Sequence, residues 1–308
     1  MALKAIKNKI KSVDRTRKVT KAMEAVSAVK MRGSQQRALS GRAYARAAVS
    51  VLSRISGSAV QEKHALTRVR PIEKVLLVVI TSDKGLAGSL NAAVLKEAEK
   101  VITGLSLSKE RISLITLGRK AKEYFARRGY EIVSSYENMS DTISIEDMQQ
   151  VTDIATERFA LGAADYVALI YTNFYSTFEQ RATSRPLLPL SIESVAELVK
   201  GIVPEKGTFS QMNDLRGHSL PTVYTVEPSE EVLFNELLPR LVGIAVYHAL
   251  NESKASEHSA RMVAMKNASD KSLEMSKDLT REYNRERQAA ITSELSEIVG
   301  GIEAMAGN

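Results

Sequence analysis

The fold is decided by a C-terminal stretch that opens with EPSEEVLFNELLPR (227–240) and closes with ITSELSEIVGGIEAM (291–305). Ser229 is placed to cap a helix, and two glutamates follow it in the first turn, where acidic side chains suit the positive end of the helix dipole. Pro239 lies close enough to this start to bend the helix without ending it, and no later proline follows. At about 1.5 Å per residue, the predicted helix is on the order of 100 Å long. A helix of that length needs a partner helix or a surrounding protein, because one small core cannot bury it.

Heptad spacing along this stretch predicts a seam that faces a partner helix. Two series of positions, each with steps of seven residues, lie three and four residues apart on the same side of the helix. The first series is Leu241, His248, Ala255, Met262, Ser269, Ser276, Tyr283 and Ala290, and the second is Leu237, Ile244, Asn251, His258, Met265, Ser272, Leu279 and Glu286. Small residues let two backbones approach closely, whereas polar ones weaken the pairing. We therefore expect a shaft whose sides also meet other proteins; a single amphipathic helix of an ordinary helical domain is the alternative.

The partner helix is predicted at the other end of the chain. Residues 1–56 contain no proline, and apolar residues recur at Ile6, Ile10, Val13, Val19, Met23, Val26, Met31, Ala38, Ala45 and Leu52. This segment is again too long for a compact core. The sequence therefore predicts one antiparallel coiled coil formed by residues 1–56 and 229–308.

Residues 72–195, between the two helices, predict a small, mostly parallel, Rossmann-like α/β domain. Strands are predicted at 74–81, 112–117, 130–135 and 166–172, and helices at 89–103, 119–128 and 144–161, with Gly104, Gly129 and Gly162 at the helix ends. The segment 178–190 is predicted as a further edge strand, because Pro186 and Pro189 suit an edge. Residues 196–228 show no clear period and are expected to form an irregular connection. The fold class is α/β with a long terminal coiled coil.

Charge is distributed unevenly along the chain. Its net charge is +7, yet residues 1–54 hold 14 Lys and Arg against two acids, so the remaining 254 residues sum to −5. A basic helical arm is compatible with nucleic acid, an anionic membrane surface or an acidic protein partner. The chain has no Cys, which excludes disulfides and thiol chemistry, and no run of 18 apolar residues.

No catalytic, cofactor or metal constellation is expected. Residues 85–89 lie between a predicted strand and helix but match neither phosphate-loop pattern, and Pro221 interrupts a sequence resembling a nucleophile elbow. The four histidines lack a metal-ligand spacing. Glu294 and Glu297, one turn apart on a helix, suit a solvated or partner-facing edge.

Apolar residues gather at the C-terminal tip of the long helix, beyond the expected reach of the shorter N-terminal helix. We call this set the tip stripe: Ile291, Leu295, Ile298, Val299, Ile302 and Met305. An exposed stripe of this kind indicates an interface. The alternative is a terminus that folds back on its own domain.

Several motifs together resemble the gamma subunit of rotary, proton-translocating ATP synthases, in the same order and over nearly the whole chain. They are ALKAIKNKIKSVDRTRKVTKAMEAVSAVKMR (2–32), TSDKGLAGSLN (81–91), YTNFYSTFEQRATSRPLLPL (171–190), ASEHSARMVAMKNASDKSLEM (255–275) and REYNRERQAAITSELSEIVGGIEAM (281–305). The resemblance implies a non-catalytic rotor shaft that couples rotation of a c-subunit ring to the catalytic beta subunits. Its implied partners are the alpha and beta subunits, epsilon and the c ring, at the cytoplasmic face of a bacterial inner membrane. The absence of Cys excludes the redox control of chloroplast members.

The resemblance also implies roles for individual residues. Contact or coupling with a beta subunit falls to Met23, Arg261, Arg287, Gln288 and Thr292. The tip stripe would turn in an apolar bearing at the top of the ring. Tyr224 and Glu227 would lie near the c ring. Two other classes remain to be separated from this one: a nucleic-acid-binding coiled coil that uses the basic arm, and a small nucleotide-binding α/β enzyme.

Overall fold

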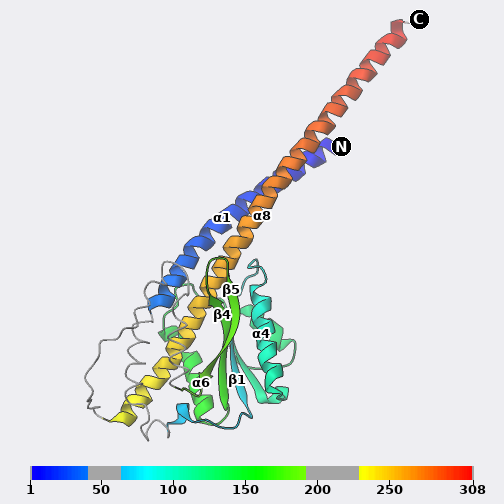
Figure 1. The fold of residues 1–308 in the computed structure, drawn as a ribbon. Helices are drawn as coiled ribbons and strands as arrows, with labels where there is room; N and C mark the ends of the chain where they lie inside the picture. Colours follow the sequence, from blue (N-terminus) through cyan, green and yellow to red (C-terminus); the bar gives the residue numbers. More distant parts are fainter. Residues whose placement is uncertain (1, 41–63, 192–228, 307–308) are drawn as a thin grey trace. The chain divides into compact units, whose positions relative to one another are not determined.

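The computed structural model describes residues 2–40, 64–191 and 229–306 (Figure 1), and it divides into two compact units. The first unit is 1–26 with 262–308, and the second is 27–261. Two long helices contribute to both units: α1 (Ala2–Ser40) and α8 (Glu230–Ala306). Pro239 lies inside α8 and does not end it, as predicted. Within these described ranges, no helix has an apolar run long enough to cross a membrane.

A five-stranded sheet forms the centre of the second unit. Its strands are β1 (Val75–Ile80), β2 (Ile112–Leu117), β3 (Glu131–Tyr136), β4 (Tyr166–Phe174) and β5 (Gln180–Leu188), in the order β3-β2-β1-β4-β5. The first four are parallel, and β5 pairs antiparallel with β4 at the edge. Strands β1 and β2 are buried along their whole length, because both faces of the sheet are covered. The predicted mostly parallel sheet with its proline-containing edge strand is therefore confirmed.

Helices cover both faces of this sheet (Figure 1). Helices α4 (Leu90–Leu105) and α5 (Arg119–Ala126) pack on one face, where Phe125 is fully buried. Helix α6 (Gln149–Ala160) and the first part of α8 pack on the other, around Phe159 and Phe234. Three short 3-10 turns complete the unit, at Ala65–Thr67, Lys109–Arg111 and Glu146–Met148. The α8 segment 241–256 is buried on all sides, which explains its almost continuous apolar sequence LVGIAVYHAL (241–250).

Boundaries of α4, α5 and α6 differ from those predicted. Gly104 lies inside α4, which ends instead at Ser106 in the left-handed conformation with φ 53°. The helix continues past Gly104 because Leu105 packs against the core on that face. The predicted reciprocal cap of Ser144 and Asp147 is present, since each backbone N–H donates to the other's side chain, at 2.8 and 3.3 Å. A 3-10 turn follows this cap before α6 begins.

Gly118 shapes the turn from β2 into α5. Its φ is +102°, and a Cβ at this position would lie 2.1 Å from the carbonyl oxygen of Thr81. The end of β1 therefore passes so close to this turn that only glycine fits.

The first unit is an antiparallel helix pair. In α8, every residue that is at least partly buried between 272 and 290 belongs to the predicted seam: Ser272, Ser276, Leu279, Tyr283, Glu286 and Ala290. Ser276 Oγ donates to Asp14 Oδ1 at 3.0 Å. The α1 side of the prediction was partly wrong, because Val19 and Val26 are 58% and 54% exposed whereas Thr20 is buried. Close approach of two helices selects the small threonine, whose hydroxyl donates to its own helix at the Arg17 carbonyl.

Candidate functional site

The tip of α8 extends beyond its partner helix within the first unit (Figure 1). Because the helices run antiparallel, the thirteen residues from Asp14 back to Ala2 face the thirteen from Ser276 on to Gln288. Residues 289–306 therefore have no part of α1 beside them, over about 27 Å. Every residue from 291 to 300 is exposed.

The tip stripe lies on this unpaired segment. Its members Ile291, Leu295, Ile298, Val299 and Ile302 are 48% to 59% exposed. The Met305 side chain lies outside the described residues. Five large aliphatic side chains on one bare helix form a surface that favours burial in another protein.

The polar residues predicted to contact a beta subunit fall in two places. Arg287 and Gln288 are exposed at the end of the paired region, and Thr292 is exposed at the start of the unpaired segment, where its Oγ1 donates to the Gln288 carbonyl at 2.9 Å. Met23, half-buried on α1, faces the level of Asn267 in the same register. Met23 thus lies about 30 Å along the pair from Arg287. The structure does not bring these residues into one site.

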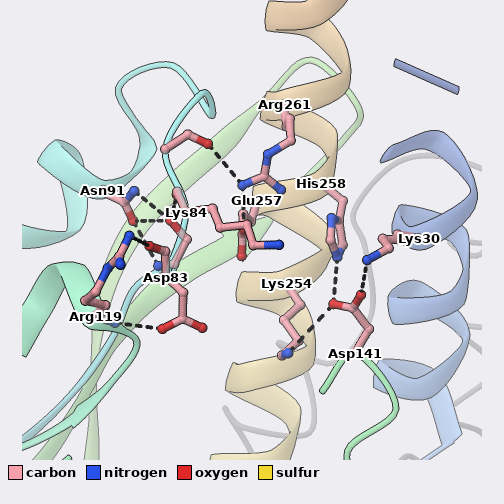
Figure 2. A network of polar contacts seen from close by, with 12 residues as sticks. Lys30, Asp83, Lys84, Asn91, Arg119, Asp141, Lys254, Glu257, His258 and Arg261 are labelled. Atoms are coloured by element: carbon pink, nitrogen blue, oxygen red, sulfur yellow. Dashed lines mark hydrogen bonds and ion pairs between the residues drawn. The ribbon is translucent and has the colours of Figure 1, made fainter. Parts of the chain in front are cut away.

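Arg261 belongs to a different environment, in the second unit. Its side chain is buried, and Nη2 donates to Glu257 Oε1 at 2.6 Å and to the Gly85 carbonyl at 3.2 Å (Figure 2). Arg261 therefore connects the loop after β1 to α8 by a hydrogen bond. Tyr224 and Glu227, predicted near the c ring, lie outside the described residues.

Sequence reasoning missed a charged cluster beside Arg261, which we call the Asp141 cluster: Lys30, Asp141, Lys254 and His258 (Figure 2). Asp141, in the loop after β3, accepts from Lys30 Nζ at 2.7 Å and lies 3.0 Å from His258 Nε2 and 3.8 Å from Lys254 Nζ. Lys254 Nζ also donates to the carbonyls of Met139 and Ser140, at 2.9 and 2.6 Å. No sequence signal marks Asp141, because its partners lie more than 100 positions away on α1 and α8.

Electrostatics keep this cluster charged except at its histidine. Burial raises the pKa of Asp141, but the bonds from Lys30 and His258 and, in the acid range where the carboxyl titrates, the charges of His258 and Lys254 outweigh it and lower that pKa from 3.8 to about 2. Burial lowers the pKa of Lys254, against the opposing pull of Asp141 and Glu257. Burial also lowers the pKa of His258. The carboxylate is therefore ionised and the imidazole neutral at neutral pH.

The loops at the carboxyl ends of the strands form hydrogen bonds with one another, in addition to those that they form with α8. Asp83, after β1, accepts from the backbone N–H of Arg119 and of Asn138, both at 2.9 Å. The cavity beside it, lined in part by Ser82, Asp83, Lys254 and Glu257, is only about 30 Å³. Open α/β sheets bind ligands at this edge, but here α8 side chains fill the position and leave space for about one water molecule. This size excludes a nucleotide in that cavity.

Comparisons with known proteins agree with the resemblance drawn from the motifs. The family model described as ATP synthase matches residues 2–305. The chain is 37% identical to the ATP synthase gamma chain of Heliobacterium modesticaldum over 98% of this chain and 99% of that one. It is 38% identical to the ATP synthase gamma chain of Pelotomaculum thermopropionicum, over 99% of both chains.

Solved structures are similar as well. A chain in the central stalk and c-ring structure of the Tetrahymena thermophila mitochondrial ATP synthase matches with a TM-score of 0.60 and 27% identity, over 82% of this chain and 99% of that chain. A chain of the Euglena gracilis mitochondrial enzyme shares the fold, with a TM-score of 0.63 and 18% identity, over 99% of this chain and 94% of that one. The motifs, the helix pair with its inserted sheet and the full-length matches agree: this chain belongs to the ATP synthase gamma-chain family.

Proposed function

We propose that this chain is the rotor shaft of an ATP synthase, and that the tip of α8 turns inside a ring of alpha and beta subunits. The observation that carries this proposal is the unpaired end of α8. Its tip stripe is exposed beyond Gln288, the last residue of α8 that faces α1; we call this residue the register limit. A bare helix with large aliphatic side chains suits an apolar bearing formed by surrounding subunits. The chain itself is a non-catalytic subunit.

The shaft acts by presenting different sides to equivalent subunits. A single helix is asymmetric, so each beta subunit in a threefold ring meets different side chains at one moment. Rotation then favours the open or closed state of each catalytic site in turn, through differential contacts. The alternative of a nucleic-acid-binding coiled coil accounts for the basic arm but not for the tip stripe.

Individual residues take distinct parts in this proposal. Arg287, Gln288 and Thr292 are exposed and free to contact a beta-subunit loop just below the bearing. Met23 would make a second contact lower on the shaft. Arg261 is buried, so we assign its coupling role to holding the loop after β1 on α8.

The other partners in this proposal are epsilon and the c ring. We propose that the α/β unit adjoins epsilon and the c ring, with Tyr224 and Glu227 near the ring, and that the complex holds this chain peripherally at the cytoplasmic face of a bacterial inner membrane. The Tetrahymena match is to a structure of central stalk and c ring, which supports this placement.

Reconstitution with purified alpha and beta subunits tests the bearing. A variant with Ile291→Ser, Leu295→Ser and Ile298→Ser loses three aliphatic side chains, each worth about 1 kcal/mol when its remaining exposed half is buried. Binding to the ring should weaken on the order of 100-fold, with a matching loss of ATP hydrolysis. The matched control carries Leu273→Ser and Met275→Ser, two exposed apolar residues of α8 within the paired region. Equal binding by the triple variant and the unchanged chain would refute the bearing.

A further inference from the structure

The Asp141 cluster joins three segments of the second unit that are distant in sequence. Asp141 and the neighbouring carbonyls of the loop after β3 bind Lys30 on α1 and Lys254 and His258 on α8 (Figure 2). These contacts hold the loop against both helices. Rotation of the shaft does not require them.

His258 is the member whose charge state decides whether the cluster is complete. Its side chain is only 7% exposed, and Nε2 lies 3.0 Å from Asp141 Oδ1. An ionised carboxylate only accepts hydrogen bonds, so Nε2 carries the proton and donates it. Nδ1 is buried and has no hydrogen-bond partner among the described residues. Protonating Nδ1 would therefore create a buried N–H without an acceptor.

The charges around His258 come from every element packed against it. Helix α8 contributes Lys254, Glu257 and Arg261, and the loop after β3 contributes Asp141. Helix α1 contributes Lys30, which binds Asp141, and Arg37, which lies near Lys254. Asp83, after β1, also lies near Lys254. The acids favour a charged imidazole, and the neighbouring Lys and Arg oppose it. Burial adds to the opposition, and the pKa of His258 is lowered from its usual 6.5.

We propose that the Asp141 cluster is a proton-sensitive closure, in which neutral His258 holds the loop after β3 on α1 and α8 and protonated His258 releases it. In the released state the imidazolium reaches water, and the loop carbonyls and Asp141 separate from α8. Because the pKa of His258 is lower in the closed state than in the open one, acid favours opening. This is a property of the chain itself and stands independently of rotation.

Hydrogen exchange of the full chain, corrected for the pH dependence of the chemical exchange rate, measures this opening. The reporter is the loop 137–142, where the Asn138 N–H donates to Asp83 and the Thr142 N–H to Ser140 Oγ. Between pH 7.5 and 5.5, protection of this loop should fall by up to about tenfold for each pH unit below about 6.5, while β2 stays protected.

Three variants make the test specific. His258→Gln keeps an N–H donor but does not titrate, so its loop protection should be independent of pH. Asp141→Asn should leave the loop weakly protected at both pH values. His64→Gln, which removes a histidine bound to Asn235 outside the cluster, should retain the normal pH response.

Constant loop protection in the unchanged chain, or an unaltered pH response in His258→Gln, would overturn the proposal. Simultaneous loss of protection in β2 would also overturn it, because the opening is expected to be local.

Discussion

Replacing Asp141 with Asn removes the charge that holds the Asp141 cluster together, and its cost follows from the carboxyl pKa. The folded state lowers that pKa from 3.8 to about 2. At about 1.4 kcal/mol per pKa unit, this corresponds to roughly 2–3 kcal/mol before solvent screening, and part of it comes from a charge on His258 that is absent at pH 7.5. The Asp141 side chain is 30% exposed, so we expect a loss of about 1–2 kcal/mol at pH 7.5. The substitution also leaves the buried ammonium of Lys254 without this counter-ion, and that penalty contributes to the loss.

The sign of the pH dependence follows from the direction of this shift. Because the folded-state pKa of Asp141 is depressed, the stabilisation that comes from its own ionisation, apart from the titration of His258 near pH 6.5, is fully present above the unfolded value of 3.8. It is lost as the pH falls from 3.8 towards 2, where the carboxyl is protonated in both states. The comparison between the two proteins therefore belongs at pH 7.5, far above this window.

Urea unfolding measures the difference. The chain has no Cys, so a dye attached at Ala92→Cys on the exposed side of α4 reports on the α/β unit alone. The matched control is Asp153→Asn, an exposed carboxylate of α6 whose one hydrogen bond within the described residues comes from Gln149, and for which we expect a change under about 0.5 kcal/mol. A loss for Asp141→Asn no larger than that of the control would refute the electrostatic argument.

Two further changes test the fold. Gly118→Ala places a Cβ 2.1 Å from the Thr81 carbonyl oxygen at a φ of +102°, so the free energy of unfolding of the α/β unit should fall by more than about 3 kcal/mol in the same urea assay. The control is Gly85→Ala, where a Cβ meets nothing within 4 Å and the loss should be under about 1 kcal/mol. Thr20→Lys places a long charged side chain at the buried seam and should lower the thermal midpoint of the helix pair, measured by circular dichroism. The exposed pair Val19→Thr and Val26→Thr should change this midpoint by less than about 1 °C. A larger drop for the valine variant than for Thr20→Lys would show that the valines, as predicted from the sequence, form the seam.

The parts of the fold that depend on patterns among residues close together in the chain could be predicted from the sequence. Strand β2 was predicted with its observed bounds, because ISLITL (112–117) is a short apolar run between turn signals. The α8 seam followed from heptad spacing, and its polar positions such as Ser272 and Ser276 are among the partly buried ones. The register limit near Gln288, by contrast, needed the observed contact between Asp14 and Ser276.

Hydrophobic periodicity was misleading where two helices approach closely. It selected Val19 and Val26 for the α1 seam, although packing at short distance selects Thr20 and leaves the valines exposed. The Asp141 cluster could not be predicted at all, because a salt bridge such as that between Lys30 and Asp141 leaves no local pattern in the sequence. The assignments of Met23 and Arg287 to beta-subunit contacts remain predictions.

The contact between Asp14 and Ser276 also has a consequence during protein synthesis. Its two residues are 262 positions apart in the chain. At about 5–20 residues per second, a ribosome that has just added Asp14 needs roughly 13–52 seconds to reach Ser276. During that interval the basic helix α1 has no α8 to pair with, while the sheet of the α/β unit, whose strands lie between 75 and 188, is already available to fold. We therefore expect the nascent α1 to depend on chaperones or on transient contacts until the last quarter of the chain emerges.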